Sequence, residues 1–87
     1  MAWRIELTAT AAKQLSKLGR KEAQRITSFL RERAAGAPRT TGGPLSGPLG
    51  ELWRYRIGDW RVLCEIEDEV MRVLVVRIAH RSDAYRR

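Results

Sequence analysis

Arginine residues gather in one short stretch of this chain, between Trp53 and Arg61. Apolar and charged residues alternate on both sides of Gly58-Asp59, with the period of two that is typical of half-buried strands. A Gly-Asp pair suits a two-residue hairpin turn, because glycine readily adopts the positive φ that such turns need. With this turn, Arg56 faces Arg61 across the hairpin, and Arg54 lies on the same face.

Three arginines on one hairpin face could bind a polyanion, because guanidinium groups donate paired hydrogen bonds to phosphate oxygens. Like charges placed opposite one another destabilise a sheet by about 0.2–1 kcal/mol. A face that only needed to be solvated would more naturally pair arginine with glutamate. The alternative is that these long side chains simply extend into water. We favour the phosphate-binding interpretation.

Three further candidates, His80, Arg81 and Tyr85, follow the last predicted strand, which ends beside Arg61. Cleavage of RNA without a metal requires a held phosphate, charge stabilisation in the transition state, a base and an acid, because the RNA 2′-hydroxyl is the nucleophile. Tyr85 could be the base if guanidinium groups stabilise its phenolate. His80 is the alternative proton carrier. A tyrosine near a chain end more often packs against a sheet edge, so residue chemistry alone favours a basic RNA-binding domain over a nuclease.

Composition supports an anionic partner. The 87 residues include 17 basic and 10 acidic side chains, a net charge of +7, and we expect one domain over residues 1–87. Nucleic acid is the first candidate partner and an anionic membrane surface the second. No stretch is long and apolar enough to cross a membrane, and the first residues are charged where a signal peptide would be apolar. The single cysteine, Cys64, fits a reduced cytoplasmic compartment, and one Cys with one His predicts no metal site and no cofactor.

The elements that would position these residues form an α+β pattern. Alternation over residues 2–7 predicts a strand, Thr8 or Thr10 could cap a helix that ends near Leu18, and a second helix should run from about Arg20 to Ala35. The basic residues of the helices most simply form a solvated face, with a supplementary nucleic-acid footprint as the other interpretation. They are Lys13, Lys17, Arg20, Lys21, Arg25, Arg31 and Arg33.

Residues 36–50 contain all three prolines and five of the seven glycines, and this predicts a loop that Leu45 and Leu49 could hold to the core. The hairpin strands follow, then a turn at Asp68-Glu69 and a fourth strand over residues 70–79. The apolar run 73–76 indicates a central strand covered on both faces. A two-residue second turn places Glu65 opposite Arg72, and Arg61 opposite Val76. We therefore predict an N-terminal strand and a two-helix hairpin packed on one face of a sheet, which a three-strand antiparallel meander completes.

The hairpin and the residues after it resemble the RelE/ParE superfamily of toxins from bacterial toxin–antitoxin pairs, specifically the RelE branch. The resemblance lies in residues 53–62 (WRYRIGDWRV), 65–68 (EIED) and 75–81 (VVRIAHR), together with Tyr85. It implies an mRNA interferase, an endoribonuclease that cuts messenger RNA in the ribosomal A site and leaves a 2′,3′-cyclic phosphate and a 5′-hydroxyl. A cognate antitoxin would silence it.

The resemblance also implies residue roles. Arg54 and Arg56 match the family's basic pair that holds the RNA phosphate. Arg61 matches the arginine after the turn, Arg81 the late arginine that stabilises the transition state or serves the leaving group, and Tyr85 the proposed base. The family often has lysines at the pair. Since arginine stays charged, we do not expect Arg54 or Arg56 to donate a proton.

Partners follow from the same resemblance. We expect mRNA on the ribosome with 16S rRNA contacts, and a hetero-oligomer with a partly disordered antitoxin that adds a helix or strand. The competing function is that of a ParE-like toxin, which inhibits DNA gyrase by binding. The arginine set with Tyr85 favours the ribonuclease, because the gyrase-inhibiting branch does not need it. A non-catalytic basic RNA-binding module is the third alternative.

Overall fold

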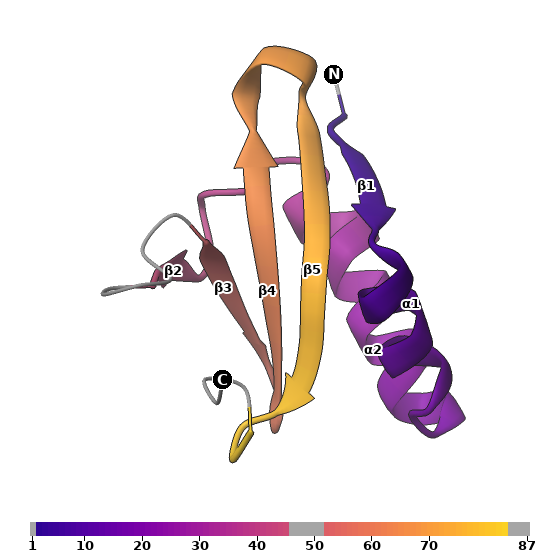
Figure 1. The fold of residues 1–87 in the computed structure, drawn as a ribbon. Coiled ribbons are helices and arrows are strands. Elements are labelled where there is room, and N and C mark those ends of the chain that lie inside the picture. The colour runs from indigo at the N-terminus through magenta and orange to yellow at the C-terminus, as the bar shows by residue number, and fades with distance from the viewer. Residues whose placement is uncertain (1, 46–51, 84–87) are drawn as a thin grey trace.

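The computed structural model describes residues 2–45 and 52–83. Within them a five-stranded sheet has the strand order β1-β5-β4-β3-β2, and two helices cover one of its faces (Figure 1). The elements in chain order are β1 (Arg4–Leu7), α1 (Ala9–Ser16), α2 (Arg20–Phe29), a π-helical turn (Leu30–Ala34), β2 (Gly43–Pro44), β3 (Trp53–Ile57), β4 (Trp60–Glu67), a 3₁₀ turn (Asp68–Val70) and β5 (Arg72–His80). The predicted α+β architecture is confirmed. No helix within these two ranges is long and apolar enough to cross a membrane.

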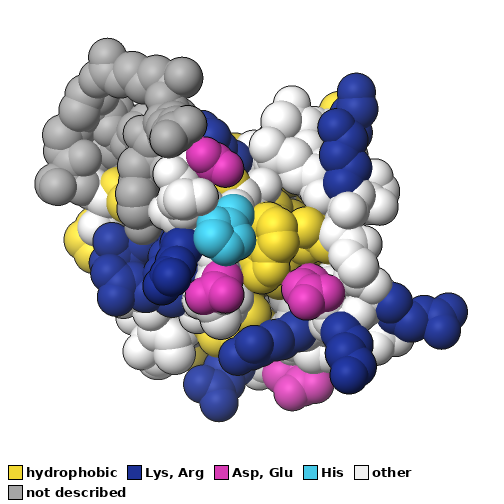
Figure 2. Space-filling view, turned by 90° about the horizontal axis from the view of Figure 1, so that it is seen from below, with side chains coloured by type: hydrophobic (Ala, Val, Ile, Leu, Met, Phe, Trp, Pro, Cys, Tyr) yellow, Lys and Arg dark blue, Asp and Glu magenta, His cyan; other side chains and the backbone are white. Residues whose placement is uncertain are grey.

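The helical hairpin forms where capping residues predicted it. Thr8 is the N-cap of α1, and its hydroxyl accepts a hydrogen bond from the Ala11 N–H at 3.1 Å. Gly19 separates the helices as the N-cap of α2. All seven basic residues of the helical segment are exposed, as a solvated face requires. Figure 2 views the molecule from the end that carries the β3–β4 turn, where Lys and Arg side chains project around a partly apolar centre.

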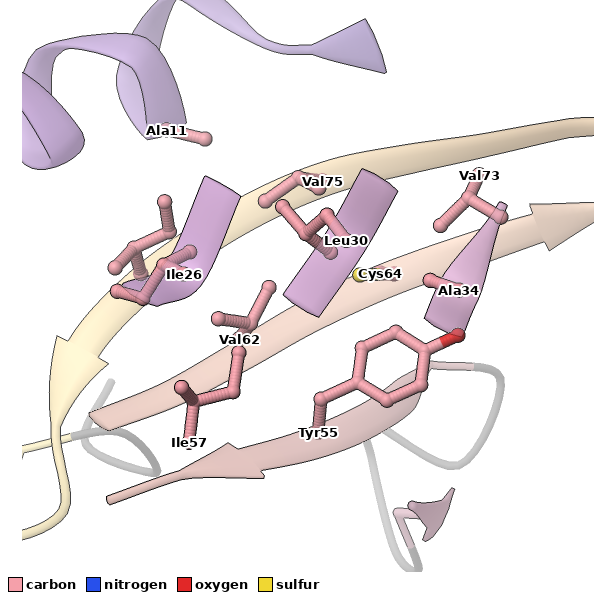
Figure 3. Close-up of a cluster of buried hydrophobic side chains, with 11 residues drawn as sticks. Ala11, Ile26, Leu30, Ala34, Tyr55, Ile57, Val62, Cys64, Val73 and Val75 are labelled. Atoms are coloured by element: carbon pink, nitrogen blue, oxygen red, sulfur yellow. The ribbon is translucent and has the colours of Figure 1, made fainter. Parts of the chain in front are cut away.

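The core lies between the helices and the sheet (Figure 3). Ile26 and Leu30 from the helical layer pack against the strand residues Val62 and Val75, and each of the four is at most 3% exposed. Burying an aliphatic side chain of this size contributes roughly 1.5–3 kcal/mol. Cys64 is fully buried in the same cluster, where desolvation raises the pKa of its thiol.

The hairpin register is as predicted: Ile57 pairs with Trp60, and Arg56 pairs with Arg61. Gly58 has a φ of 61°, whereas Asp59 has a negative φ, which is the pattern of a type II′ turn with glycine in its first central position. The Gly58-Asp59 turn and the local alternation are enough to determine this register, because a slip of one residue would turn every apolar side chain away from the core.

The predicted β4–β5 register is wrong. Arg72 pairs with Glu67 rather than Glu65, and Arg61 pairs with Ala79 rather than Val76. One cause is the turn, which is longer than the predicted two-residue loop. It consists of the 3₁₀ segment Asp68–Val70 followed by Met71, whose backbone is left-handed with a φ of 52°. A second cause is an irregularity between Leu63 and Cys64, where the register shifts by one residue.

The prediction that β5 is covered on both faces is also corrected. The strand is central, between β1 and β4, and β1 runs parallel to it. Val73 and Val75 are fully buried toward the helices, but Leu74 and Val76 keep intermediate exposure. Although residues 73–76 are all apolar, the helices cover only one face of β5 within the described parts of the chain.

The segment expected to be a plain loop carries more structure than predicted. Residues 43–44 form β2 along β3, and two hydrogen bonds hold the preceding residues: the Tyr55 hydroxyl donates to the Pro38 carbonyl at 2.6 Å, and the Trp53 Nε1–H donates to the Thr41 carbonyl at 2.8 Å. Burial raises the pKa of Tyr55, so this phenol stays a donor. Leu45 is buried as predicted, and Leu49 lies outside the described residues.

Candidate functional site

The predicted arginines lie on the sheet face that the helices leave uncovered. The β3–β4–β5 register places them in two neighbouring rows: Arg56 and Arg61 in one, and Arg54 and Arg77 with Leu63 between them in the other. Adjacent strands are about 4.8 Å apart and alternate residues about 7 Å apart along a strand, so all four side chains start within roughly 12 Å of one another. We call these four residues, Arg54, Arg56, Arg61 and Arg77, the arginine face.

The two rows differ in how much they are packed. Leu63 is only 2% exposed although it lies outside the main core cluster, because its row neighbours Arg54 and Arg77 flank it with long aliphatic stems. The Arg54 side chain is half-buried, and Arg56 is exposed. The arginine face therefore has an apolar base beneath Arg54 and Arg77, while Arg56 is its most exposed member.

Charge is distributed unevenly over this sheet face. At the far end, Arg72 contacts Glu67 at 2.6 Å and Glu6 at 3.1 Å, so cations and carboxylates compensate one another. In the described residues, Arg54, Arg56 and Arg61 take part in no ion pair. The hairpin end of the sheet therefore presents positive charge that the described carboxylates do not neutralise, and this is the electrostatic requirement for binding an anion.

Arg61 and Arg81 both contact residues of the β3–β4 turn. The Arg61 Nη1 donates to the Gly58 and Trp60 carbonyls, each at 3.0 Å. The Arg81 backbone N–H donates to the Asp59 carbonyl at 2.7 Å, and its side-chain Nε lies 3.8 Å from the Asp59 carboxylate. The turn thus holds Arg81 beside the arginine face, as the chain order predicted.

His80 lies on the other side of the sheet. It pairs with Trp60, whose ring packs against the core cluster, and the two rings meet edge to face with centroids 5.6 Å apart. The Ser82 backbone N–H donates to His80 Nδ1 at 3.3 Å, which keeps the ring at this end of β5. The structure therefore does not bring His80 onto the arginine face.

Two residues remain to be placed: Tyr85, which was predicted to belong to the site, and Arg77, which was not. Tyr85 lies outside the described residues. Arg77 belongs to the arginine face but was not among the predicted site residues, because the register shift in β4–β5 could not be read from the residue pattern. Within residues 2–45 and 52–83, no three His, Cys, Asp or Glu side chains are grouped as metal ligands would be. The fold and this surface define a small, basic α+β protein with a positively charged sheet face.

Comparison with known proteins identifies the family. A family model described as the ParE toxin of the type II toxin–antitoxin system parDE matches residues 5–85. The chain belongs to this family of toxins, and its relatives place it in the RelE branch, as the hairpin motif predicted.

Three relatives support this assignment. Toxin RelE of Mycobacterium tuberculosis is 37% identical over 84 residues, which are 97% of this chain and 87% of that protein. Toxin RelG of the same organism is 32% identical over 87 residues, which are the whole of both chains. The crystal structure of the toxin–antitoxin complex RelBE2 from Mycobacterium tuberculosis contains a chain with a TM-score of 0.88 and 29% identity, and the match covers 95% of each chain.

The isolated E. coli RelE toxin has the same fold, with a TM-score of 0.78 at 21% identity over 91% of this chain and 84% of that one. This chain is therefore a toxin of a toxin–antitoxin pair of the RelE family.

Proposed function

We propose that this toxin is an endoribonuclease that cuts messenger RNA in the ribosomal A site and thereby inhibits translation. The observation that carries the proposal is the arginine face, where Arg54, Arg56 and Arg61 have no carboxylate partner among the described residues. A sheet that only had to fold would gain by pairing these cations. The RelE relatives support the same activity.

In the proposed reaction the RNA supplies its own nucleophile. The 2′-oxygen attacks the adjacent phosphorus, the bond from phosphorus to the 5′-oxygen breaks, and the departing 5′-oxygen takes a proton from water. The products are a 2′,3′-cyclic phosphate and a 5′-hydroxyl. Arg54 and Arg56 hold the phosphate, because guanidinium groups match two phosphate oxygens at once. The reaction as proposed uses no metal and no cofactor.

The remaining roles belong to the turn and to the end of the chain. Arg61 stabilises the negative charge that develops on the phosphoryl oxygens in the transition state. Arg81, which the Asp59 carbonyl holds at the turn, stabilises the leaving 5′-oxygen. Tyr85 is the proposed base that takes the 2′-hydroxyl proton. His80 remains only an auxiliary candidate, because its pairing with Trp60 turns it away from the arginine face.

The proposed partners follow from the relatives. Toxin chains similar to this one have been solved in toxin–antitoxin complexes, and we propose that a cognate antitoxin forms a hetero-oligomer with this chain. An acidic segment would suit its net charge of +7. The same charge favours contacts with 16S rRNA when mRNA is bound on the ribosome. As part of this proposal, the activity is cytoplasmic.

The test is a cleavage assay on translating ribosomes with end-labelled mRNA. Wild type should give cuts phased with codons, and Arg61→Ala, Arg81→Ala and Tyr85→Phe should each lower the rate by roughly tenfold or more. Arg31→Ala, an exposed change away from the arginine face, should leave the rate nearly unchanged. A folded wild-type protein that makes no cuts would refute the proposal. Full activity of Tyr85→Phe would refute only the assignment of the base.

A second function deserves a direct test, because the matching family model is described as the ParE toxin. If this chain acted as a ParE-like gyrase inhibitor, it would block DNA supercoiling by gyrase without cutting RNA. Inhibition of supercoiling by wild type that persists in Arg61→Ala and Tyr85→Phe would favour this alternative. Binding of RNA with neither strand scission nor gyrase inhibition would favour a non-catalytic RNA-binding module.

A further inference from the structure

A recess of about 320 Å³ opens between the helical layer and β3, next to the arginine face. Its wall combines three segments that are distant in sequence: the end of the helical hairpin, the residues before β2, and the strand itself. The described lining residues are Phe29, Arg33, Thr41, Gly42, Arg54 and Arg56. Two of the arginine-face residues therefore also border a second space, in which a helical arginine joins them.

The recess concentrates unneutralised positive charge. Arg33, Arg54 and Arg56 form no ion pair with any carboxylate of the described residues. The Arg33 guanidinium lies 5.9 Å from the ring centroid of Phe29, and its side chain donates no hydrogen bond to any of the described residues. By contrast, Arg39, which lies two residues before Thr41 in the chain, contacts the Asp68 carboxylate through two hydrogen bonds, of 2.7 and 2.8 Å. The chain thus pairs one arginine of this region and leaves three available to a ligand.

Two polar atoms of the lining residues are buried without a hydrogen-bond partner among the described residues. They are Nε of Arg54 and Oγ1 of Thr41. Buried donors are rarely left unpaired, and an unpaired one in a native structure needs an explanation. Turned toward the recess by a rotation of their side chains, both groups could donate to an anion seated there, which would compensate the charge of the three arginines at the same time.

The recess is also preformed. The Trp53 side chain holds the Thr41 carbonyl, and the Tyr55 hydroxyl holds the Pro38 carbonyl, so the residues before β2 are fixed against β3. Gly42 has a φ of 77° and is packed so tightly that an added Cβ would collide with the Arg54 carbonyl oxygen. A wall held in this way does not have to be ordered when a ligand binds, which favours affinity.

We propose that this recess binds a second backbone phosphate of the same RNA strand, and that Arg33 is an RNA-binding residue. The inference rests on the proposed ribonuclease function, since a strand held by Arg54 and Arg56 on the arginine face would continue into the recess. RNA is favoured over a protein segment because Phe29 is the one apolar side chain in the described lining. Protein partners usually anchor on buried aromatic or aliphatic groups.

The test measures RNA binding without cleavage. The probe is a short, fluorescein-labelled single-stranded RNA with 2′-O-methyl groups at every position, which the proposed chemistry cannot cut. Fluorescence anisotropy should show that Arg33→Gln raises Kd by about tenfold, because a charge-assisted hydrogen bond to phosphate is lost. The slope of log K against log salt should fall in magnitude by about 0.7, the value for one phosphate contact on a single strand.

Arg31→Gln is the matched control. Arg31 is exposed on the same π-helical turn and lines a different, mainly apolar space beside β1, so its replacement removes the same charge at another place. We expect it to change Kd by about twofold or less, through the general field alone. Thermal unfolding of both variants provides the folding control. Equal effects of the two substitutions, or an unchanged Kd for Arg33→Gln, would overturn the proposal.

Single neutral linkages locate the contact. In a series of RNAs, one methylphosphonate replaces each backbone phosphate in turn. At one position this replacement should weaken RNA binding by the wild type but not by Arg33→Gln, because the two changes remove the same interaction. If Arg33→Gln weakens antitoxin binding and leaves RNA binding unchanged, the recess belongs to the protein partner and the proposal is overturned. Arg33-dependent RNA binding by a chain that cuts no mRNA on ribosomes would refute the ribonuclease and leave the phosphate site standing.

Discussion

Replacing Arg56 with glutamine is expected to stabilise the fold and weaken RNA cleavage at the same time. Arg56 lies directly opposite Arg61, and it forms neither an ion pair nor a side-chain hydrogen bond in the part of the chain that the structure describes. Its removal therefore breaks no ion pair or side-chain hydrogen bond within the described residues, and it relieves a repulsion between like charges. In a two-residue hairpin the pair beside the turn is hydrogen-bonded, so the Arg56–Arg61 pair is the next, non-hydrogen-bonded one, whose side chains are closer.

The expected magnitudes are modest for stability and larger for activity. Opposed like charges on a sheet cost about 0.2–1 kcal/mol, which corresponds to a rise in Tm of roughly 1–8 °C for a domain of this size. A charged hydrogen bond to phosphate contributes about 1.5–3 kcal/mol, so kcat/KM for mRNA cleavage should fall by roughly 10- to 100-fold.

Thermal unfolding at low and high salt, together with the ribosome cleavage assay, measures both effects. Arg31→Gln removes the same charge at an exposed helical position and controls for the general effect of net charge. Arg56→Glu adds a further comparison, because it creates an opposite-charge pair with Arg61 and should raise Tm more than Arg56→Gln does. At about 1 M salt screening should remove most of the gain, since the Debye length is then near 3 Å.

Two results would refute this reasoning. If Arg56→Gln lowered Tm, or raised it no more than Arg31→Gln, the two facing arginines would not repel one another in the folded protein. If Arg56→Gln became more stable and still cut mRNA at the wild-type rate, Arg56 would not hold the RNA phosphate. A gain in stability with a loss of cleavage is the combination expected of a residue kept for binding at the expense of folding.

Three further predictions concern stability. Tyr55→Phe should cost about 1–3 kcal/mol in urea unfolding, because the buried Pro38 carbonyl loses its donor; an unchanged midpoint would contradict this. Gly42→Ala should cost at least about 1–3 kcal/mol, because only glycine adopts a φ of 77° easily, and a wild-type Tm would count against it. Arg39 lowers the pKa of Asp68 through a hydrogen bond and its charge, so the pair's small contribution should be present above the ordinary aspartate pKa of about 3.9 and lost as the pH falls below it. Asp68→Asn should then differ from wild type near neutral pH and match it in strong acid, whereas a pH-independent difference would argue against the pair.

The hairpin was predictable because its determinants are local. Alternation from Trp53 to Cys64 and the Gly58-Asp59 turn are sufficient to define the pairing of β3 with β4, and the structure has the same register. The helices were equally predictable, since Thr8 and Gly19 mark their starts.

The pairing of β4 with β5 was not predictable from the same kind of pattern. The prediction assumed a two-residue turn, but a 3₁₀ segment and the left-handed Met71 make the connection. The register shift beside Leu63 then adds one more residue. With the predicted register, Arg77 would have faced Trp60 and the core; in the structure it joins the arginine face.

The sequence by itself determined the α+β class of the fold, the excess of positive charge and the facing arginines, because composition, strand alternation and a glycine turn act over a few neighbouring residues. Only the tertiary structure decided that Arg77 belongs to the arginine face, that His80 lies on the other side of the sheet, and that Arg33 borders the same recess as Arg54. These placements depend on turn length, on an irregularity in strand pairing and on how helices dock against a sheet. Each of them brings together segments that are far apart along the chain, and a local sequence pattern does not determine which distant segments come into contact.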